Sequence, residues 1–462
     1  MHADPNDSPP LHGAAPSADL VITDCTALVD TSGPTAIFVR GASIVVRGGS
    51  IESVLGPGQP VPAAEHTIDA GGMVAMPGLV NTHCHAAMTL FRGAAEDVEV
   101  NSWFNEYIWP MEVNLTERDV YLGTMVACAE MISCGVTTFA DQYFHMHEAA
   151  RAVDESGMRA NLGWAFFSTQ GDEGLDVSVD FAERFRGAAN GRISTSIVPH
   201  APYTVSDEHL SRAADHARRL GVRVHTHASE DIAQTRRSIA ERGITPIDVL
   251  DRTGVLDAGC IIAHGNGIVD SDIPLLSERR DRVGVGHGPK GYLKFALERL
   301  TPLRQLIDAG VPVGYCTDGA ASNNTLDILE NMRFTATSQK FVVDDATWFT
   351  SAAALHMAGP GSAAVVGMSG QLGTLQPGAR ADIILVDVSG FHCQPLHDTA
   401  AAIVYSVQPS DVRTTIVDGR VLMRDRTLLT IDTQSLLDEF RDRANTITDR
   451  SHGRTIQDYR AR

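Results

Sequence analysis

The sequence predicts an α/β protein, a (β/α)8 barrel with a small β-rich domain built from both chain ends. Three observations lead to this prediction. Between residues 76 and 369, short apolar segments of strand length alternate with segments of helix length. Residues 19–75 and 370–462 have a different texture, in which short β segments are separated by turns. Several of the apolar segments in the middle of the chain end in His or Asp.

The first residues are expected to form no element. Residues 1–18 are rich in Pro, Ala and polar residues and lack the basic start and apolar core of a signal peptide. We therefore expect a disordered tail. Segments 20–29, 35–56 and 67–70 then read as strands, and Gly41 marks one of the turns that separate them.

The middle of the chain holds the predicted barrel. Its strands are expected at 77–83, 136–141, 159–167, 193–200, 222–227, 260–265, 283–288 and 312–318. Helices are expected between them, among others at 117–135, 146–157, 207–221, 231–243 and 301–310. Several of these segments end in Gly, which is a common helix stop. A doubly wound open sheet is the alternative, and the absence of a GxGxxG motif after the first strand weighs against it.

Short β segments separated by turns occur again in the C-terminal part of the chain. Segments 372–387 and 412–432 read as strands, with a hairpin turn at Asp418 and Gly419. Segment 434–451 has the pattern of an amphipathic helix. The simplest arrangement pairs residues 19–75 with residues 370–462 in one domain beside the barrel.

Charge and cysteine content narrow the class of protein. The formal net charge is −20, which disfavours nucleic acid and anionic membranes as partners. No run of about 18 apolar residues occurs, so we expect no transmembrane helix. The seven cysteines form no CxxC pair, which favours free thiols in a reducing cytoplasm.

The first barrel strand ends in His83-Cys84-His85. Side chains alternate along a strand, so the two histidines point to the same side and Cys84 points to the other. Two imidazoles on one side can bind one metal ion, although such a pair is also found as the polar end of an ordinary strand. Cys84 is expected to pack away from the site.

Later strands end in further polar residues. His225 and His227 end the fifth strand, His264 the sixth and Asp318 the eighth, while His200 ends the fourth. The C-terminal ends of barrel strands share one face, where barrel enzymes hold their active sites. Imidazoles with one carboxylate suit Zn²⁺, with Fe²⁺ as second choice. The sequence therefore predicts one divalent metal ion, and His225 is expected beside the ligands rather than among them.

Several longer stretches resemble the amidohydrolase superfamily, and within it the aminohydrolases that deaminate heterocycles. They run from about residue 20 to about residue 430 and include 76-MPGLVNTHCHAAMTLFRG-93, 225-HTHASE-230, 317-TDGAASNNTLDILENMR-333 and 374-TLQPGARADIILVD-387. The resemblance is greatest to methylthioadenosine/S-adenosylhomocysteine deaminases and chlorohydrolase-type enzymes. It implies a small heterocyclic substrate and a possible homo-oligomer.

The resemblance also implies residue roles. The metal ligands would be His83, His85, His227 and Asp318. Glu230 would shuttle protons, His264 would hydrogen-bond the attacking oxygen, and Asp318 would accept its proton. Glu112 and His200 match positions that contact the nucleoside, with Glu230 on the base, and Trp103 is expected as an aromatic pocket wall.

Two departures from the family pattern bear on the substrate. The stretch after the seventh strand reads 287-HGPKGYLKFALE-298, where relatives carry a Cys and a Ser-Asn pair. Residues 164–179 contain no arginine, so the carboxylate of S-adenosylhomocysteine would lack a charged partner there. We therefore expect an uncharged substrate such as adenosine, 5′-deoxyadenosine, methylthioadenosine or a free amino-heterocycle.

Other readings remain open at this stage. One is hydrolysis of an s-triazine or another amino- or chloro-substituted ring. A second, of another class, is a non-catalytic metal-binding barrel, which the presence of both Glu230 and Asp318 disfavours. A third is a two-metal cyclic-amide hydrolase, which would need a lysine on the fourth strand, and residues 193–200 contain none.

Overall fold

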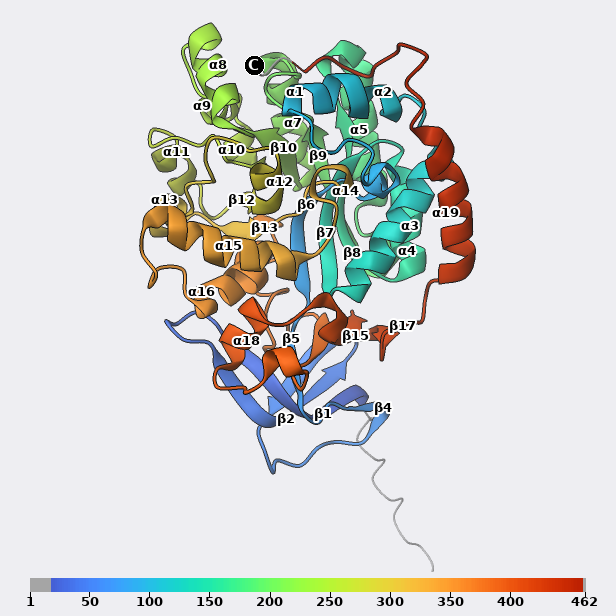
Figure 1. Cartoon of the computed structure of the whole chain (residues 1–462), viewed down its shortest axis with the longest axis vertical. Coiled ribbons are helices and arrows are strands. Elements are labelled where there is room, and N and C mark those ends of the chain that lie inside the picture. The colour runs from blue at the N-terminus through green and yellow to red at the C-terminus, as the bar shows by residue number, and fades with distance from the viewer. Residues whose placement is uncertain (1–17, 460–462) are drawn as a thin grey trace, which may run out of the picture.

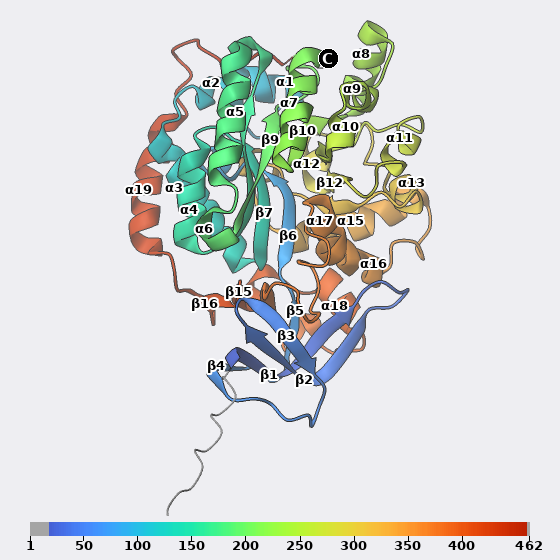
Figure 2. The same ribbon diagram turned by 180° about the vertical axis from the view of Figure 1, so that it is seen from behind.

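A computed structural model describes residues 18–459, and it confirms the predicted fold class. A barrel of parallel strands occupies the upper part of the molecule, with a mixed sheet below it (Figure 1, Figure 2). The barrel strands follow one another in chain order around the sheet. They are β6 (Leu79–Cys84), β7 (Val136–Tyr143), β8 (Arg159–Phe166), β9 (Ile193–Pro199), β10 (Arg223–Ala228), β11 (Cys260–His264), β12 (Val283–His287) and β13 (Val313–Tyr315).

The first and last barrel strands meet through side-chain and loop hydrogen bonds. Asn81 Nδ2 donates to Thr317 Oγ1 over 2.7 Å, and the Asp318 amide donates to the His83 carbonyl over 3.1 Å. β13 is shorter than the predicted 312–318 because the chain turns out of the strand, and Asp318 has a φ of +60°. This turn sets Asp318 against the end of β6.

Helices surround the barrel, and many begin and end as their sequences predict. Thr116 and Asp119 form a capping box at the start of α3, and Gly221 ends α7 with a φ of +64°. The longer helices are α3 (Glu117–Ser133), α4 (Met146–Ser156), α5 (Gly171–Phe185), α7 (Asp207–Leu220), α8 (Ile232–Arg242) and α15 (Ile328–Val343). The shorter ones include α1 (Val100–Ser102), α2 (Trp109–Glu112), α9 (Pro246–Arg252), α12 (Pro289–Lys294), α13 (Leu303–Asp308), α14 (Ala320–Asn323), α16 (Ser351–His356) and α18 (Thr399–Tyr405).

The second sheet combines strands from both chain ends. Its N-terminal members are β1 (Ala18–Asp30), β2 (Ile37–Arg47), β3 (Ser50–Leu55), β4 (Ala64–Asp69) and β5 (Met73–Pro77). Its C-terminal members are β14 (Ile383–Asp387), β15 (Val412–Val417), β16 (Arg420–Arg424) and β17 (Thr427–Leu428). β14 pairs antiparallel with β5, which joins the two chain ends as predicted.

The predicted domain boundaries at residues 75 and 370 stay a prediction. Of the expected disordered tail, residues 1–17 lie outside the described residues, and Ala18 is the first residue of β1. The predicted C-terminal helix is α19 (Thr433–Ile447), and it lies along α3 of the barrel (Figure 1). Arg443 Nε and Nη2 donate to the Asp119 carboxylate over 2.6 and 2.8 Å.

A buried ion-pair network joins the lower end of the barrel to the mixed sheet. Arg159, at the start of β8, donates from Nε and Nη2 to both carboxylate oxygens of Asp382 over 2.8 and 3.0 Å. Its Nη2 also lies 3.0 Å from Asp418 Oδ1. The Asp418 amide in turn donates to Asp382 Oδ1 over 2.8 Å, so these groups satisfy one another.

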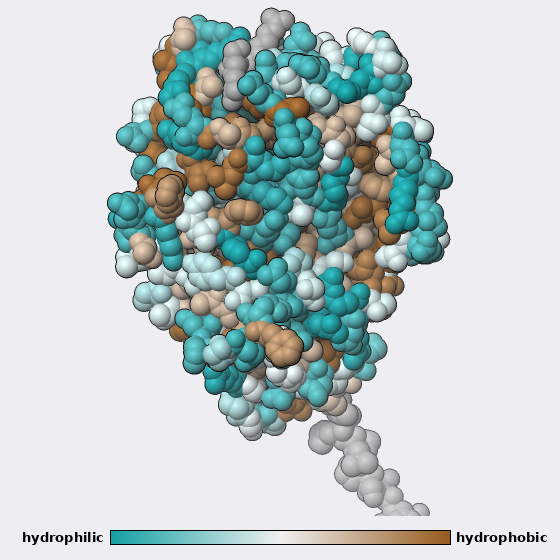
Figure 3. Space-filling view, in the orientation of Figure 1, coloured by the Kyte–Doolittle hydropathy of each residue, from teal (hydrophilic) through white to brown (hydrophobic). Residues whose placement is uncertain are grey.

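The surface matches the composition. The face shown in Figure 3 is mostly hydrophilic, and its apolar groups lie in several separate patches. Over residues 18–459, no helix has both the length and the apolar character needed to cross a bilayer.

Candidate active site

The carboxyl ends of the barrel strands bring the predicted metal ligands together. His83 and His85 lie at the end of β6, His227 on β10 and Asp318 just after β13. Asp318 Oδ1 lies 3.4 Å from His83 Nε2 and 3.2 Å from His85 Nε2. The Nε2 atoms of His85 and His227 are 3.3 Å apart. Four potential ligand groups thus face one small space.

The three histidine rings are oriented by partners on the side away from the cluster, although Gln142 Nε2 also approaches His227 Nε2 to 2.7 Å. On the far side of each ring, Nδ1 has a partner: His83 Nδ1 lies 3.0 Å from His225 Nε2, His85 Nδ1 donates to the Gln142 carbonyl over 2.7 Å, and His227 Nδ1 to the His200 carbonyl over 2.9 Å. His83 Nε2 is buried and has no hydrogen-bond partner. Metal-bound histidines are typically oriented in this way, so the residues fit a divalent metal site.

Charge in the cluster is distributed unevenly. Although burial opposes it, the contacts with His83 and His85 hold the pKa of Asp318 well below its usual range, so its carboxylate is ionised. Burial lowers the pKa of His83 to about 3, which keeps that ring neutral. For His85, burial is outweighed by Asp318, and its pKa rises to about 9. A divalent ion would have to displace that proton from His85.

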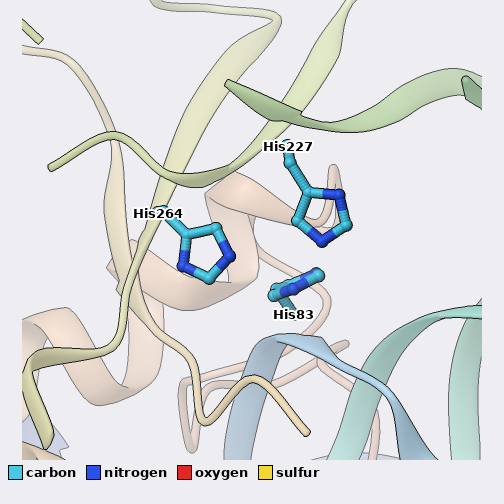
Figure 4. A group of neighbouring side chains, drawn as sticks. All are labelled: His83, His227 and His264. Carbon is cyan, nitrogen blue, oxygen red and sulfur yellow. The ribbon is translucent and has the colours of Figure 1, made fainter. Parts of the chain in front are cut away.

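His264 completes the group of rings at the end of β11. The rings of His83, His227 and His264 converge in Figure 4, and each offers one nitrogen within 4.8 Å of the other two. His264 has a φ of +75°, a conformation that non-glycine residues rarely adopt. Its carbonyl accepts hydrogen bonds from Tyr292 Oη and Thr301 Oγ1, both over 3.2 Å. These bonds hold His264 in its strained backbone conformation.

Glu230 lies beside the ligands in the loop after β10. Its amide donates to Gln234 Oε1 over 2.9 Å, and Gln234 Nε2 donates to Glu230 Oε1 over 3.1 Å. Burial raises the pKa of Glu230 to about 8, against the opposing effect of the Gln234 hydrogen bond. At neutral pH this carboxyl group is therefore mostly protonated and can act as a proton donor.

A pocket opens from this cluster toward the upper surface. The empty space within it, including its open mouth, is about 550 Å³. All of the predicted site residues line it except His83, which is fully buried beneath. Its lining comprises His85, Met88, Trp103, Phe104, Trp109, Glu112, Gln142, Tyr143, Phe144, Ala165, Phe167, His200, His227, Glu230, His264, Asp318 and Ile456.

The predicted substrate-contacting residues are held by neighbours in the pocket wall. Glu112 Oε1 accepts a hydrogen bond from Tyr143 Oη over 2.5 Å, and burial raises the pKa of Glu112 to about 7. His200 Nδ1 lies 2.9 Å from Thr204 Oγ1, and burial lowers the pKa of His200 to about 3. Trp103 is buried against the same pocket.

Cys84 packs away from the metal cluster, as predicted. Its side chain is buried, and its Sγ lies 3.9 Å from Asp141 Oδ1. Burial raises the pKa of the thiol well above its usual value, so it stays protonated.

Several residues of the site were not predicted from the sequence. Gln142 fixes His85, Tyr292 fixes His264, and Ser322 Oγ donates to Asp318 Oδ2 over 2.5 Å. Tyr292 belongs to the divergent stretch after β12, so that difference from relatives could have drawn attention to it. Ile456 lines the pocket from the far C-terminus, and no motif surrounds it.

The fold and the site together define a metal-dependent hydrolase built on a (β/α)8 barrel. The family model described as "Amidohydrolase family" matches residues 74–422. The chain therefore belongs to the amidohydrolase family.

Deaminases of other organisms are similar to this protein over most of the chain. A "5-methylthioadenosine/S-adenosylhomocysteine deaminase" of Pelotomaculum thermopropionicum is 41% identical over 94% of this chain and 100% of its own length. A "5′-deoxyadenosine deaminase" of Methanosarcina mazei is 38% identical, over 94% and 99%. The solved structure of an adenosine deaminase from Xanthomonas campestris with bound zinc is 32% identical, with a TM-score of 0.88 over 94% of this chain and 99% of that one.

Proposed function

We propose that this protein hydrolytically deaminates an adenine-type nucleoside or a similar aminated N-heterocycle and releases ammonia. The observation that carries the proposal is the position of Glu230, a buried carboxyl group with a raised pKa beside the converging His83, His85, His227 and Asp318. Relatives that deaminate adenosine-type nucleosides support the same reaction class.

The side chains of the site supply the proton transfers that this reaction requires. A divalent ion held by the four ligands would lower the pKa of water from about 15.7 to about 7, which supplies hydroxide at neutral pH. Glu230 donates its proton to a ring nitrogen, so that the neighbouring amino-bearing carbon accepts the attacking oxygen. Asp318, being ionised, takes the proton that the water loses.

The remaining steps stabilise the intermediate and release the amine. His264 is neutral because burial lowers its pKa, and its ring N–H can donate a hydrogen bond to the oxygen that adds to the ring. The proton that Asp318 took from water passes to the amino group, which leaves as ammonia, and the proton still on the added oxygen passes to Glu230, which restores the carboxyl group. The ring carbon keeps the oxygen, so one water is consumed for each ammonia formed.

Recognition of the rest of the substrate is assigned to the pocket walls. Trp103 offers a flat apolar surface that suits a heterocyclic ring. Glu112 and His200 lie on the pocket wall and can form hydrogen bonds with hydroxyl groups of a nucleoside.

We also propose zinc as the ion, with iron as second choice. Three imidazoles and one carboxylate are a typical zinc donor set, and the Xanthomonas campestris relative was solved with zinc. The seven cysteines all lie within the described residues and are unpaired, which supports a reducing compartment, the cytoplasm.

The test is ammonia release by the zinc-loaded protein across a substrate panel. The panel contains adenosine, 5′-deoxyadenosine, methylthioadenosine, S-adenosylhomocysteine, a pterin and an amino- or chloro-s-triazine. We expect ammonia from at least one adenine nucleoside. Release of ammonia or chloride only from the triazine would favour the s-triazine hydrolase instead. A protein with one metal ion per chain that turns over no panel member would contradict the proposal.

A further inference from the structure

The chain after α19 crosses the mouth of the active-site pocket. Residues 448–459, here called the strap, run over the top of the barrel past α1 and α2 (Figure 1, Figure 2). Ile456 lines the pocket itself. Tyr459 lines an adjoining hollow that shares Trp103, Phe104 and Glu230 with it. The strap thus supplies an aliphatic side chain to the pocket and an aromatic one to the hollow.

Specific contacts hold the near end of the strap on the barrel. Asn114 Nδ2 donates to the carbonyls of Ile447 and Asp449 over 2.9 and 2.7 Å. Arg450 Nη1 donates to the Glu106 carbonyl over 2.6 Å, and its guanidinium lies 4.1 Å from the centre of the Tyr107 ring.

The far end of the strap is held by a reciprocal pair of hydrogen bonds. Asn105 Nδ2 donates to the Tyr459 carbonyl over 2.9 Å, and the Tyr459 amide donates to Asn105 Oδ1 over 2.7 Å. The Tyr459 ring stacks on Phe104, with ring centres 4.3 Å apart, and meets Tyr203 edge-on at 5.6 Å. Tyr459 is only 3% exposed, so this end of the strap is packed as a wall and not as a loose tail.

The charge of the pocket limits which group can lie under the strap. Among the described residues, the lining of the pocket and of the adjoining hollow contains no Lys or Arg. It contains the carboxyl groups of Glu112, Glu230, Asp231 and Asp318. His85 is a proposed metal ligand at the strand ends, so a carboxylate at the remote end of the substrate would find no cationic side chain in this lining. An apolar group would pack on Ile456 and the aromatic walls.

We propose that the strap is part of the substrate site. Ile456 and Tyr459, which Asn105 holds in place, favour nucleosides that carry an uncharged, apolar group at the end remote from the reacting ring. The reacting ring must lie at the strand ends, beside Glu230, His264 and Asp318. The remote end of the substrate therefore points toward the pocket mouth and the strap. This inference rests on the proposed deaminase function.

The test compares methylthioadenosine, whose remote end is apolar, with adenosine and S-adenosylhomocysteine in three full-length variants. Ile456→Ala should raise KM about tenfold for methylthioadenosine and less than about threefold for adenosine, with kcat within about twofold. Ile456→Arg should raise the kcat/KM ratio of S-adenosylhomocysteine to methylthioadenosine at least about tenfold. Asn105→Leu, which removes the two hydrogen bonds to Tyr459, should reproduce the selective KM effect of Ile456→Ala.

The matched control is Arg454→Ala, an exposed strap residue outside both linings. It should behave as the unmodified protein does with every substrate. Equal KM changes for methylthioadenosine and adenosine in Ile456→Ala, or no change for either, would overturn the inference. So would an unchanged substrate ratio in Ile456→Arg. If the unmodified protein instead releases no ammonia from any nucleoside, the proposed function fails, and that result is distinct from these.

Discussion

Two buried polar clusters lie at opposite ends of the barrel, and they differ in how completely their members satisfy one another. At the lower end, Arg159 and Asp382 form a two-pronged ion pair, and Asp418 adds a third acceptor. At the upper end, His83 Nε2 is buried and makes no hydrogen bond, with Asp318 Oδ1 3.4 Å away, and two histidine nitrogens approach to 3.3 Å. The lower cluster is complete as it stands, whereas the upper one is arranged to receive an ion.

This difference distinguishes buried charges that stabilise the fold from buried charges that serve a function. A buried ion pair whose geometry is complete holds segments together, and removing one partner leaves an uncompensated charge. In the protein without a ligand, buried nitrogen atoms that accept no hydrogen bond lower the stability. Binding of a metal ion and of the substrate offsets that loss. We expect mutations in the lower cluster to change stability and mutations in the upper one to change chemistry.

The largest expected effect is at Glu230. Replacing Glu230 by Gln removes the proton donor but keeps the size and the contact with Gln234, so kcat should fall by about 10²–10⁴-fold. Metal content, measured by elemental analysis, should stay at one ion per chain. Glu241→Gln, at an exposed position on α8, is the control. A kcat within a few-fold of the unmodified value would remove Glu230 from the mechanism.

The lower cluster should respond in the opposite way. Arg159→Met leaves the Asp382 carboxylate buried and unpaired, so the free energy of unfolding should fall by about 3–5 kcal/mol. Denaturant melts measure this, and kcat of the folded fraction should stay close to the unmodified value. Arg184→Met removes an exposed pair with Asp180 and should cost less than about 0.5 kcal/mol. Equal losses in the two variants would erase the distinction between buried and exposed pairs.

A smaller effect is expected at His225, which contacts a proposed ligand but is not one. With Nε2 of His83 on the ion, Nδ1 of His83 carries the proton and donates to His225 Nε2. His225→Phe removes this acceptor, so metal affinity should fall about 10–100-fold. Competition with a metal-binding dye measures the affinity. Unchanged affinity would show that His225 is only packing.

The activity should also depend on pH through Glu230. The proposed mechanism uses the protonated form, and burial raises the pKa of this group to about 8. As pH rises through that value the donor is lost, so kcat/KM should fall about tenfold per pH unit on the alkaline side. Rate measurements between pH 6 and about 10 test this. An alkaline limb that persists in Glu230→Gln would belong to another group.

The smallest effect is expected at Cys84. The side chain is buried beside Asp141 and points away from the ligands, so Cys84→Ser should change kcat/KM by less than about twofold. Metal content should be unaffected. Loss of the ion in this variant would mean that the thiol, and not the imidazole pair alone, holds the metal.

Local patterns in the sequence predicted the strands and the ends on which the site is built. Alternation along β6 placed His83 and His85 on one side, and the Gly stops after α4, α7 and α8 all adopt positive φ. Contacts between distant segments had no such signal. Arg159 and Asp382 are 223 residues apart, and Asn105 and Tyr459 are 354 apart. Neither pair belongs to a periodic pattern, so only the folded chain reveals the lower cluster and the strap.

The position of Asp318 also bears on when the site can form during synthesis. Its amide donates to the His83 carbonyl, so the proposed ligand set spans the first and the last strand of the barrel. A nascent chain that has not yet extended past β13 offers histidines but lacks the carboxylate. The complete set can arise only after all eight barrel strands have been synthesised, so we expect metal binding by all four proposed ligands to be a late event in the making of this protein.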